Sequence, residues 1–278
     1  MRAFLLGSSL ALLVSACGGS SLGSSRDGAA PADAATDTDG AGAAPADVGP
    51  DTNGCPPALA SAAELASTPR ADVNLELLAL KLSPGKLVAP QATYERVVRD
   101  VGAIRARGPE LAAISFFPYA DGKTLTLTVP AAIADQMEAE TYHAWDCLNE
   151  SYGAATPFEY IRIGKTPPDV FVYLKVRGTY AMELLAAEYA KLPDVSSADG
   201  NAVGGDGPTI CATAEGSTWH YVFDAASGDC PAGCIDHVFR HFTTSPAGVV
   251  TEAETWSTKS GTPRPSWVTE LAAPARCH

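Results

Sequence analysis

Apolar residues recur at helical spacing between residues 89 and 108. A stripe that repeats every three to four residues is typical of an amphipathic helix with one face on a core. Gly108 and Pro109 end this pattern, as expected at a helix terminus. The segment therefore predicts one helix, whose buried stripe consists of Tyr94, Val97, Val98, Val101 and Ile104.

Other segments have the pattern of strands. In the segment 123–129, three apolar residues alternate with threonines, so one face of a strand is buried and the other faces water. Further strands are predicted at 74–83, 110–118 and 168–178, and a short strand or turn is predicted at 196–201. Helices are predicted at 130–153 and 179–195. This order predicts an α+β fold, a mainly antiparallel sheet with helices on one face in a ferredoxin-like or propeptide-like arrangement.

After residue 204 the chain becomes rich in aromatic and β-branched residues. Three such segments, at 217–223, 234–244 and 248–256, predict a three-stranded β-meander. The last residues, 262–278, are expected to be irregular and pinned by Cys277. We therefore expect two parts, an α+β domain at 55–204 and a meander with a C-terminal tail at 205–278, packed on the first.

The N-terminus has the pattern of an export signal. Arg2 precedes an apolar stretch that is too short to span a bilayer as a mature helix. The residues Val14-Ser15-Ala16-Cys17 resemble the lipobox of bacterial lipoproteins. This resemblance implies a signal peptide at 1–16 and acylation of Cys17, for example with palmitate. The alternative is an ordinary secretory signal, in which Cys17 is incidental.

The segment 17–54 is predicted to be a disordered tether. It consists mainly of Ala, Gly, Ser, Pro and Asp, which offer little apolar surface to offset the entropy of ordering. Gly18 and Gly19 follow the cysteine, and by analogy with enterobacterial sorting this indicates the outer membrane. The formal net charge of the chain is −13 and its Lys and Arg residues are scattered, which argues against a nucleic-acid partner.

Three short motifs resemble those of a group of uncharacterised secreted bacterial lipoproteins. They are W-D-C-L-N-x-x-Y-G at 145–153, Y-A-x-L-P-x-V at 189–195 and G-D-C-P-A-G-C at 228–234. The group has no assigned activity, so this resemblance implies export and a fold.

The segment 170–201 is similar to the later part of propeptide-type inhibitors of subtilisin-like proteases. In that family a helix and an L-P-x-V sequence precede the last strand, and the segment after that strand enters the protease cleft. The resemblance implies a propeptide-like fold and an extracytoplasmic protease as a partner. This chain has Asp199-Gly200 where Glu-Pro is usual, and it continues beyond the expected last strand.

Seven cysteines occur in the chain, and Cys17 is the predicted lipidation site. The six remaining cysteines are an even number, which in an exported protein indicates disulfides. Their connectivity is left open. The disulfide candidates are Cys55, Cys147, Cys211, Cys230, Cys234 and Cys277. We favour the pair Cys230–Cys234, because the intervening turn can bring the two Cα atoms close enough.

The stretch "GDCPAGCIDHVFRH" also allows a zinc site made of Cys230, Cys234, His237 and His241. Four ligands would have to converge at roughly 2.0–2.3 Å from one ion. On a strand, the two histidines share a face but lie about 13 Å apart. We therefore favour a disulfide staple, with the histidines on a sheet face near His220.

No familiar catalytic motif occurs in the mature chain, which contains neither a G-x-S-x-G elbow nor an H-E-x-x-H sequence. The segment Trp145–Asn149 is distinctive, and Asp146 and Asn149 are candidate binding residues. We expect no catalytic residues, no cofactor and no bound metal. The sequence thus favours a lipid-anchored interaction or envelope protein; the alternatives are a propeptide-like protease inhibitor and a zinc protein.

Overall fold

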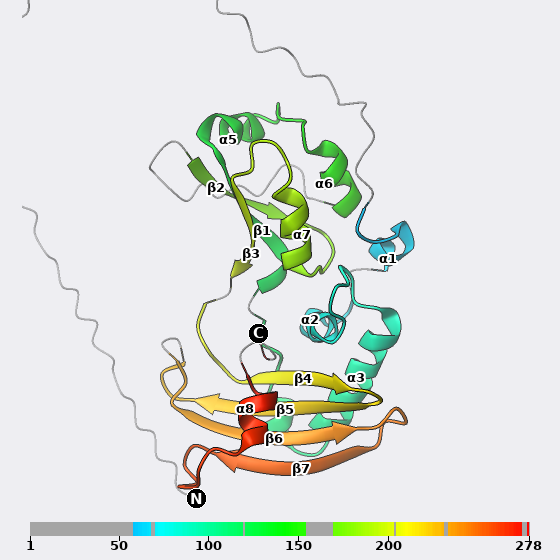
Figure 1. Cartoon of the computed structure of the whole chain (residues 1–278), viewed down its shortest axis with the longest axis vertical. Coiled ribbons are helices and arrows are strands. Elements are labelled where there is room, and N and C mark those ends of the chain that lie inside the picture. Colours follow the sequence, from blue (N-terminus) through cyan, green and yellow to red (C-terminus); the bar gives the residue numbers. More distant parts are fainter. Residues whose placement is uncertain are drawn as a thin grey trace, which may run out of the picture. The chain divides into compact units, whose positions relative to one another are not determined.

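The computed structural model describes residues 58–67, 70–118, 120–153, 169–202, 204–230, 233–273 and 277. They form an α+β structure with two antiparallel sheets, one of three strands and one of four (Figure 1). The predicted α+β class is confirmed. The change in composition after residue 204 falls between the last strand of the first sheet and the first strand of the second.

The first sheet has the strand order β2-β1-β3. Its strands are β1 (Ala120–Pro130), β2 (Asp169–Lys175) and β3 (Ser197–Ala202). Alternate residues of β1 and β2, among them Leu125, Leu127 and Val172, are fully buried. They pack in one core with residues of α5 (Ala131–Glu138), α6 (Asp146–Tyr152) and α7 (Met182–Tyr189). One face of this sheet is therefore covered by helices, as the alternation of Leu and Thr predicts.

The second sheet is a meander with the order β4-β5-β6-β7. Its strands are β4 (Thr209–Glu215), β5 (Thr218–Ser227), β6 (Asp236–Thr244) and β7 (Val250–Ser257). The expected number of three strands is wrong, because β4 adds a fourth. The residues Ile210 and Cys211 of β4 are buried on opposite faces of the sheet, against different core clusters.

Two predicted strands are wrong. The segment 74–83 forms helix α2 (Val73–Lys81), and the Asp72 side chain caps it by accepting a hydrogen bond from the backbone N–H of Leu75. The six consecutive residues Leu75 to Leu80 are all buried, so the apolar run has no period that would separate a helix from a buried strand. The segment 110–118 begins with the short helix α4 (Pro109–Ala112) and continues without a strand. The first sheet is consequently smaller than a ferredoxin-like sheet.

The remaining helices follow the predictions with local differences. The predicted helix at 89–108 is α3 (Gln91–Arg105), but Val98 of the expected stripe is 39% exposed. The predicted helix at 130–153 is interrupted near Glu140, whose φ of 57° lies in the left-handed region, and it forms α5 and α6. Two short helices are additional, α1 (Ala62–Ala66) and α8 (Ser266–Leu271).

Helix α8 corrects the expectation of an irregular C-terminal tail. The two faces of the second sheet have different coverings: the residues Tyr221, Phe223 and Phe242 pack with residues of α2 and α3. The opposite face packs against Val268 of α8 and against Cys277.

Of the helices that the structure describes, none has the length and apolar character that crossing a bilayer requires.

Candidate functional site

The face of the second sheet that packs against α8 carries several polar and aromatic side chains. Side chains alternate between the two faces of a strand, so residues at every second position share this face. From β5 come His220, Val222 and Asp224, and from β6 come His237, Phe239 and His241. The antiparallel register places Asp224 opposite Phe239 and Val222 opposite His241. We call this surface the α8 face.

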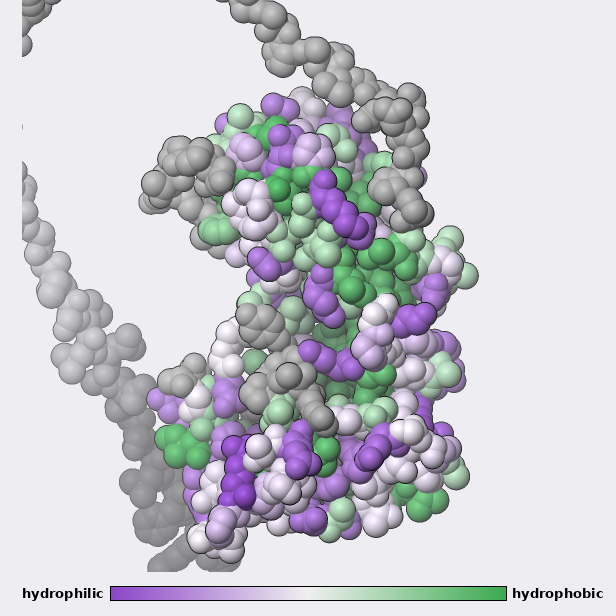
Figure 2. All heavy atoms as spheres, viewed as in Figure 1, coloured by the Kyte–Doolittle hydropathy of each residue, from purple (hydrophilic) through white to green (hydrophobic). Residues whose placement is uncertain are grey.

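A cavity of about 270 Å³ lies on the α8 face. It is lined by residues that include Asp206, Thr209, Asp224, His237, Trp256 and Arg264. A pocket of this size with a few converging polar groups is the usual setting for a small ligand. A smaller cavity, of about 110 Å³, adjoins α2 and has a mainly apolar lining that includes Leu77 and Phe116. On the surface seen in Figure 2, hydrophobic residues gather over α2. We take the cavity on the α8 face as the candidate site, because its lining includes Asp224, whose buried Oδ1 has no hydrogen-bond partner among the described residues.

Asp224 is a buried carboxylate in the lining of this cavity, with 5% of its surface exposed. Its Oδ2 atom lies 2.8 Å from Nδ1 of His237. Its Oδ1 atom is also buried, and it accepts no hydrogen bond within the described part of the chain. Burial raises the pKa of Asp224 to about 6, and the hydrogen bond with His237 opposes this rise. At neutral pH the cavity therefore holds a carboxylate with one unused acceptor.

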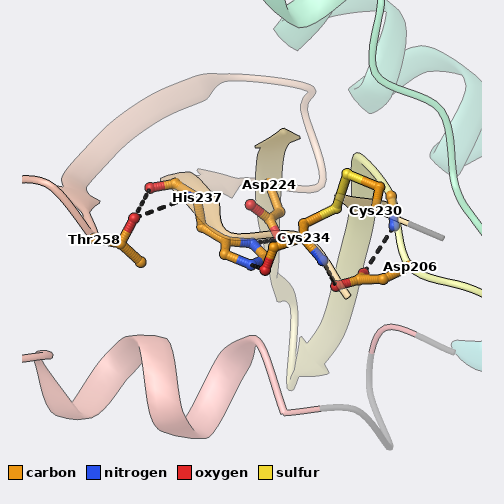
Figure 3. Close-up of a disulfide and its surroundings, with 7 residues drawn as sticks. Asp206, Asp224, Cys230, Cys234, His237 and Thr258 are labelled. Carbon is orange, nitrogen blue, oxygen red and sulfur yellow. Dashed lines mark hydrogen bonds and ion pairs between the residues drawn. A yellow bond between two sulfur atoms is a disulfide. The ribbon is translucent and has the colours of Figure 1, made fainter. Parts of the chain in front are cut away.

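His237 is held in one orientation by three contacts. Besides Asp224, the ring meets the carbonyl oxygen of Cys234, 3.2 Å from Nε2. The backbone N–H of His237 donates to Oγ1 of Thr258 at 3.0 Å. Figure 3 shows the ring directed toward Asp224 and Cys234. Both ring nitrogens are thus engaged by protein oxygens, and the ring forms a fixed wall beside the carboxylate.

The disulfide Cys230–Cys234 closes the turn that precedes β6. This is the pairing that the sequence favoured. Asp206 ties the turn to the cavity: its Oδ2 accepts from the backbone N–H of Cys234, and its own N–H donates to the carbonyl of Cys230, both at 3.0 Å (Figure 3). The staple therefore positions the carbonyl that contacts His237.

Stacked rings form the other wall of the cavity. The ring centroids of His237 and Phe239 are 5.3 Å apart, and those of Phe239 and Trp256 are 6.0 Å apart, with nearly parallel planes in both pairs. Trp256 Nε1 donates to Oγ1 of Thr262 at 3.2 Å. The guanidinium carbon of Arg264 lies 5.7 Å from the centroid of Phe239. Because Arg264 is exposed, it forms part of the rim.

The four residues of the zinc alternative do not converge. Cys230 and Cys234 are bonded to each other, His237 faces Asp224, and His241 faces a different partner. Within the ranges that the structure describes, no group of three or more His, Cys, Asp or Glu side chains could hold a metal ion.

His241 occupies the other end of the α8 face. Its Nε2 lies 3.0 Å from Nδ1 of His220, and its ring stacks on Trp267 of α8. The sequence predicted that His237 and His241 lie near His220; this holds for His241, whereas His237 contacts Asp224. Burial, and then the nearby His220, lower the pKa of His241. This pair connects α8 to the sheet and does not line the cavity.

The other cysteines have structural positions or lie outside the described residues. Cys277 is bonded to Cys211 of β4, so the C-terminal tail is pinned as expected. Cys147 is also disulfide-bonded. Cys55 and the predicted lipidation site Cys17 lie outside the described residues.

The candidate binding residues Asp146 and Asn149 have separate environments. Asp146 is exposed and pairs with His143, 2.9 Å from Oδ2 to Nδ1. Asn149 is buried, and its Oδ1 accepts a hydrogen bond of 2.8 Å from the hydroxyl of Tyr189. Asn149 thus joins α6 to α7 within the first core, and neither residue lines the candidate cavity.

The residues that matter most in the cavity, Asp224, Trp256 and Arg264, were not identified from the sequence. One signal for Asp224 was present. In β5, the aromatic residues Trp219, Tyr221 and Phe223 alternate, so an acid at position 224 falls on the other face, which also carries His220. In comparisons with protein-family models, curated proteins and solved structures, nothing matches this chain. The resemblances to secreted lipoproteins and to propeptide-type inhibitors therefore stay predictions.

Proposed function

We propose that this protein is an exported bacterial lipoprotein, held on the outer membrane by acyl chains on Cys17, and that its folded part is a non-catalytic binding module. The observation that carries the binding role is the buried Oδ1 of Asp224, which lines a cavity and accepts no hydrogen bond within the described chain. A buried acceptor without a donor is costly, and a ligand that donates to it removes that cost.

The surroundings of His237 support binding over turnover. A histidine that acts as a general base needs a free ring nitrogen within reach of a nucleophile. Here one ring nitrogen faces Asp224 and the other faces the carbonyl of Cys234. The hydroxyls of Thr209 and Thr258 accept backbone N–H groups of Phe117 and His237, respectively. Incubation of the full chain with a panel of ester, amide and glycoside substrates should leave them intact; turnover that the Asp224→Asn substitution abolishes would contradict the non-catalytic role.

The anchor rests on Val14-Ser15-Ala16-Cys17 and on the apolar stretch before it. In a bacterial host fed an alkyne analogue of palmitate, we expect the full chain to carry the label and to sediment with the membranes. The Cys17→Ala variant should lose the label, because the acylated thiol is absent. A labelled Cys17→Ala variant, or an unlabelled wild type that is released into the medium, would contradict a lipid anchor at this residue.

A further inference from the structure

The unpaired oxygen of Asp224 sets the first requirement for a ligand. Oδ2 of this carboxylate is engaged by His237, so a ligand can reach only Oδ1. A carboxylate oxygen only accepts hydrogen bonds, and the ligand must therefore offer an N–H or O–H donor. A guanidinium group prefers both oxygens of a carboxylate at once, which this geometry does not allow. A single compact donor is the better match.

The charges around the cavity set the second requirement. Among the described residues that line it are two carboxylates, Asp206 and Asp224, and one arginine, Arg264, at the exposed rim. Anions are repelled by the two carboxylates, and a neutral donor satisfies the hydrogen bond without balancing their charge. A cationic donor satisfies both the hydrogen bond and the charge.

The aromatic wall sets the third requirement. Phe239 and Trp256 present apolar ring surface beside Asp224. Arg264 already lies over the ring of Phe239, which shows that this wall accommodates a positive charge. A ligand with a short apolar stem next to its cationic group can use the wall and the carboxylate together.

We propose that the cavity binds an organic ammonium ion, a primary amine on a short apolar stem. The ammonium group donates to Oδ1 of Asp224, and the stem packs on Phe239 and Trp256. This inference rests on the proposed binding function and names its ligand class. Arg264 at the rim is attracted by the same carboxylates as the ligand. Its positive charge therefore lowers the affinity of the cavity for a cationic ligand.

Calorimetric titration of the full chain in detergent micelles at pH 8 tests the ligand class. The probes are n-butylammonium, 1-butanol and butyrate, which share a stem length and differ in charge and donor. We expect n-butylammonium to bind at least about tenfold more tightly than 1-butanol, as for a charged hydrogen bond. Butyrate should not bind measurably. This comparison uses only the wild-type protein, so it does not depend on the folding of a variant.

Three variants locate the site. Asp224→Asn should weaken n-butylammonium binding by about tenfold or more, since it removes the charge and keeps the shape. Asp199→Asn removes an equal charge from an exposed position in the first sheet and should bind like the wild type. Arg264→Gln should bind n-butylammonium more tightly. Thermal unfolding of each variant shows whether its fold is intact.

The outcomes separate this inference from the function on which it rests. If 1-butanol or butyrate binds as tightly as n-butylammonium, and Asp224→Asn weakens that binding, the ammonium class is wrong and the binding function stands. If n-butylammonium binds equally well to the wild type and to a folded Asp224→Asn variant, the proposed site is wrong. If none of the three probes binds, the proposed ligand class is wrong. Titration with compounds of other chemistry then tests the binding function.

Discussion

Replacing Asp100 with alanine should lower the free energy of unfolding by about 3–5 kcal/mol, the range for breaking a buried ion pair. Asp100 of α3 is fully buried. Its Oδ1 accepts from Arg99 at 2.8 Å and its Oδ2 accepts from the hydroxyl of Thr244 at 2.7 Å. Arg96 and Tyr221 lie within 3.5 Å of the same carboxylate. The substitution leaves the buried hydroxyls of Tyr221 and Thr244 without this acceptor and removes the link from α3 to β5 and β6.

Urea denaturation followed by circular dichroism measures this loss. Asp199→Ala is the matched control, because it removes an exposed carboxylate from β3 and should change stability by less than about 0.5 kcal/mol. Asp100→Asn should lie between the wild type and Asp100→Ala, since the amide oxygen still accepts one hydrogen bond. A loss below about 1 kcal/mol for Asp100→Ala would mean that the network does not join the helix to the sheet.

Removing the disulfide Cys211–Cys277 should cost about 4 kcal/mol, whereas removing Cys230–Cys234 should cost about 2 kcal/mol. A cross-link restricts the unfolded chain more when it closes a longer loop. The first pair is separated by 66 residues and the second by 4. Loss of Cys277 also frees the end of the chain after α8, which covers the cavity-bearing face of the second sheet.

Double alanine variants of each pair, denatured in urea without reductant, give the comparison. The short-loop variant Cys230→Ala/Cys234→Ala is the control for the chemistry of cysteine replacement. Equal losses for both double variants, or a larger loss for the short loop, would contradict the loop-entropy explanation.

Much of the architecture could be predicted from periodicity. The helix α3 and the strand β1 each have one buried face, so their patterns specify their type. The helix α2 could not be predicted in this way. Its residues Leu75, Glu76 and Leu78 are all buried, and a run that is buried on every side has no polar face to set a period. The strand β4 is short, and its two buried faces hide its alternation in the same way.

The candidate site depends on contacts that a single sequence does not display. Alternation places His237 and His241 on one face, and the turn chemistry favours the disulfide between Cys230 and Cys234. Asp224 joins His237 only through the register of β5 and β6. Arg264 reaches Phe239 only because the chain turns back after β7 and places α8 on the sheet. The sequence therefore identified His237 and His241 on the α8 face, whereas Asp224 and Arg264 join the site only through the tertiary structure.

The central claim is that the cavity at Asp224 binds a ligand, and the amide ¹H–¹⁵N spectrum of the full chain tests it most directly. The protein is screened against small cations, neutral alcohols and carboxylates. At least one class of compound should shift the signals of His237 and Trp256, including the indole N–H, and leave Asp199 of the first sheet unchanged. If no class of compound moves these signals, or if the shifts lie around residues outside the cavity, the cavity at Asp224 is not a binding site.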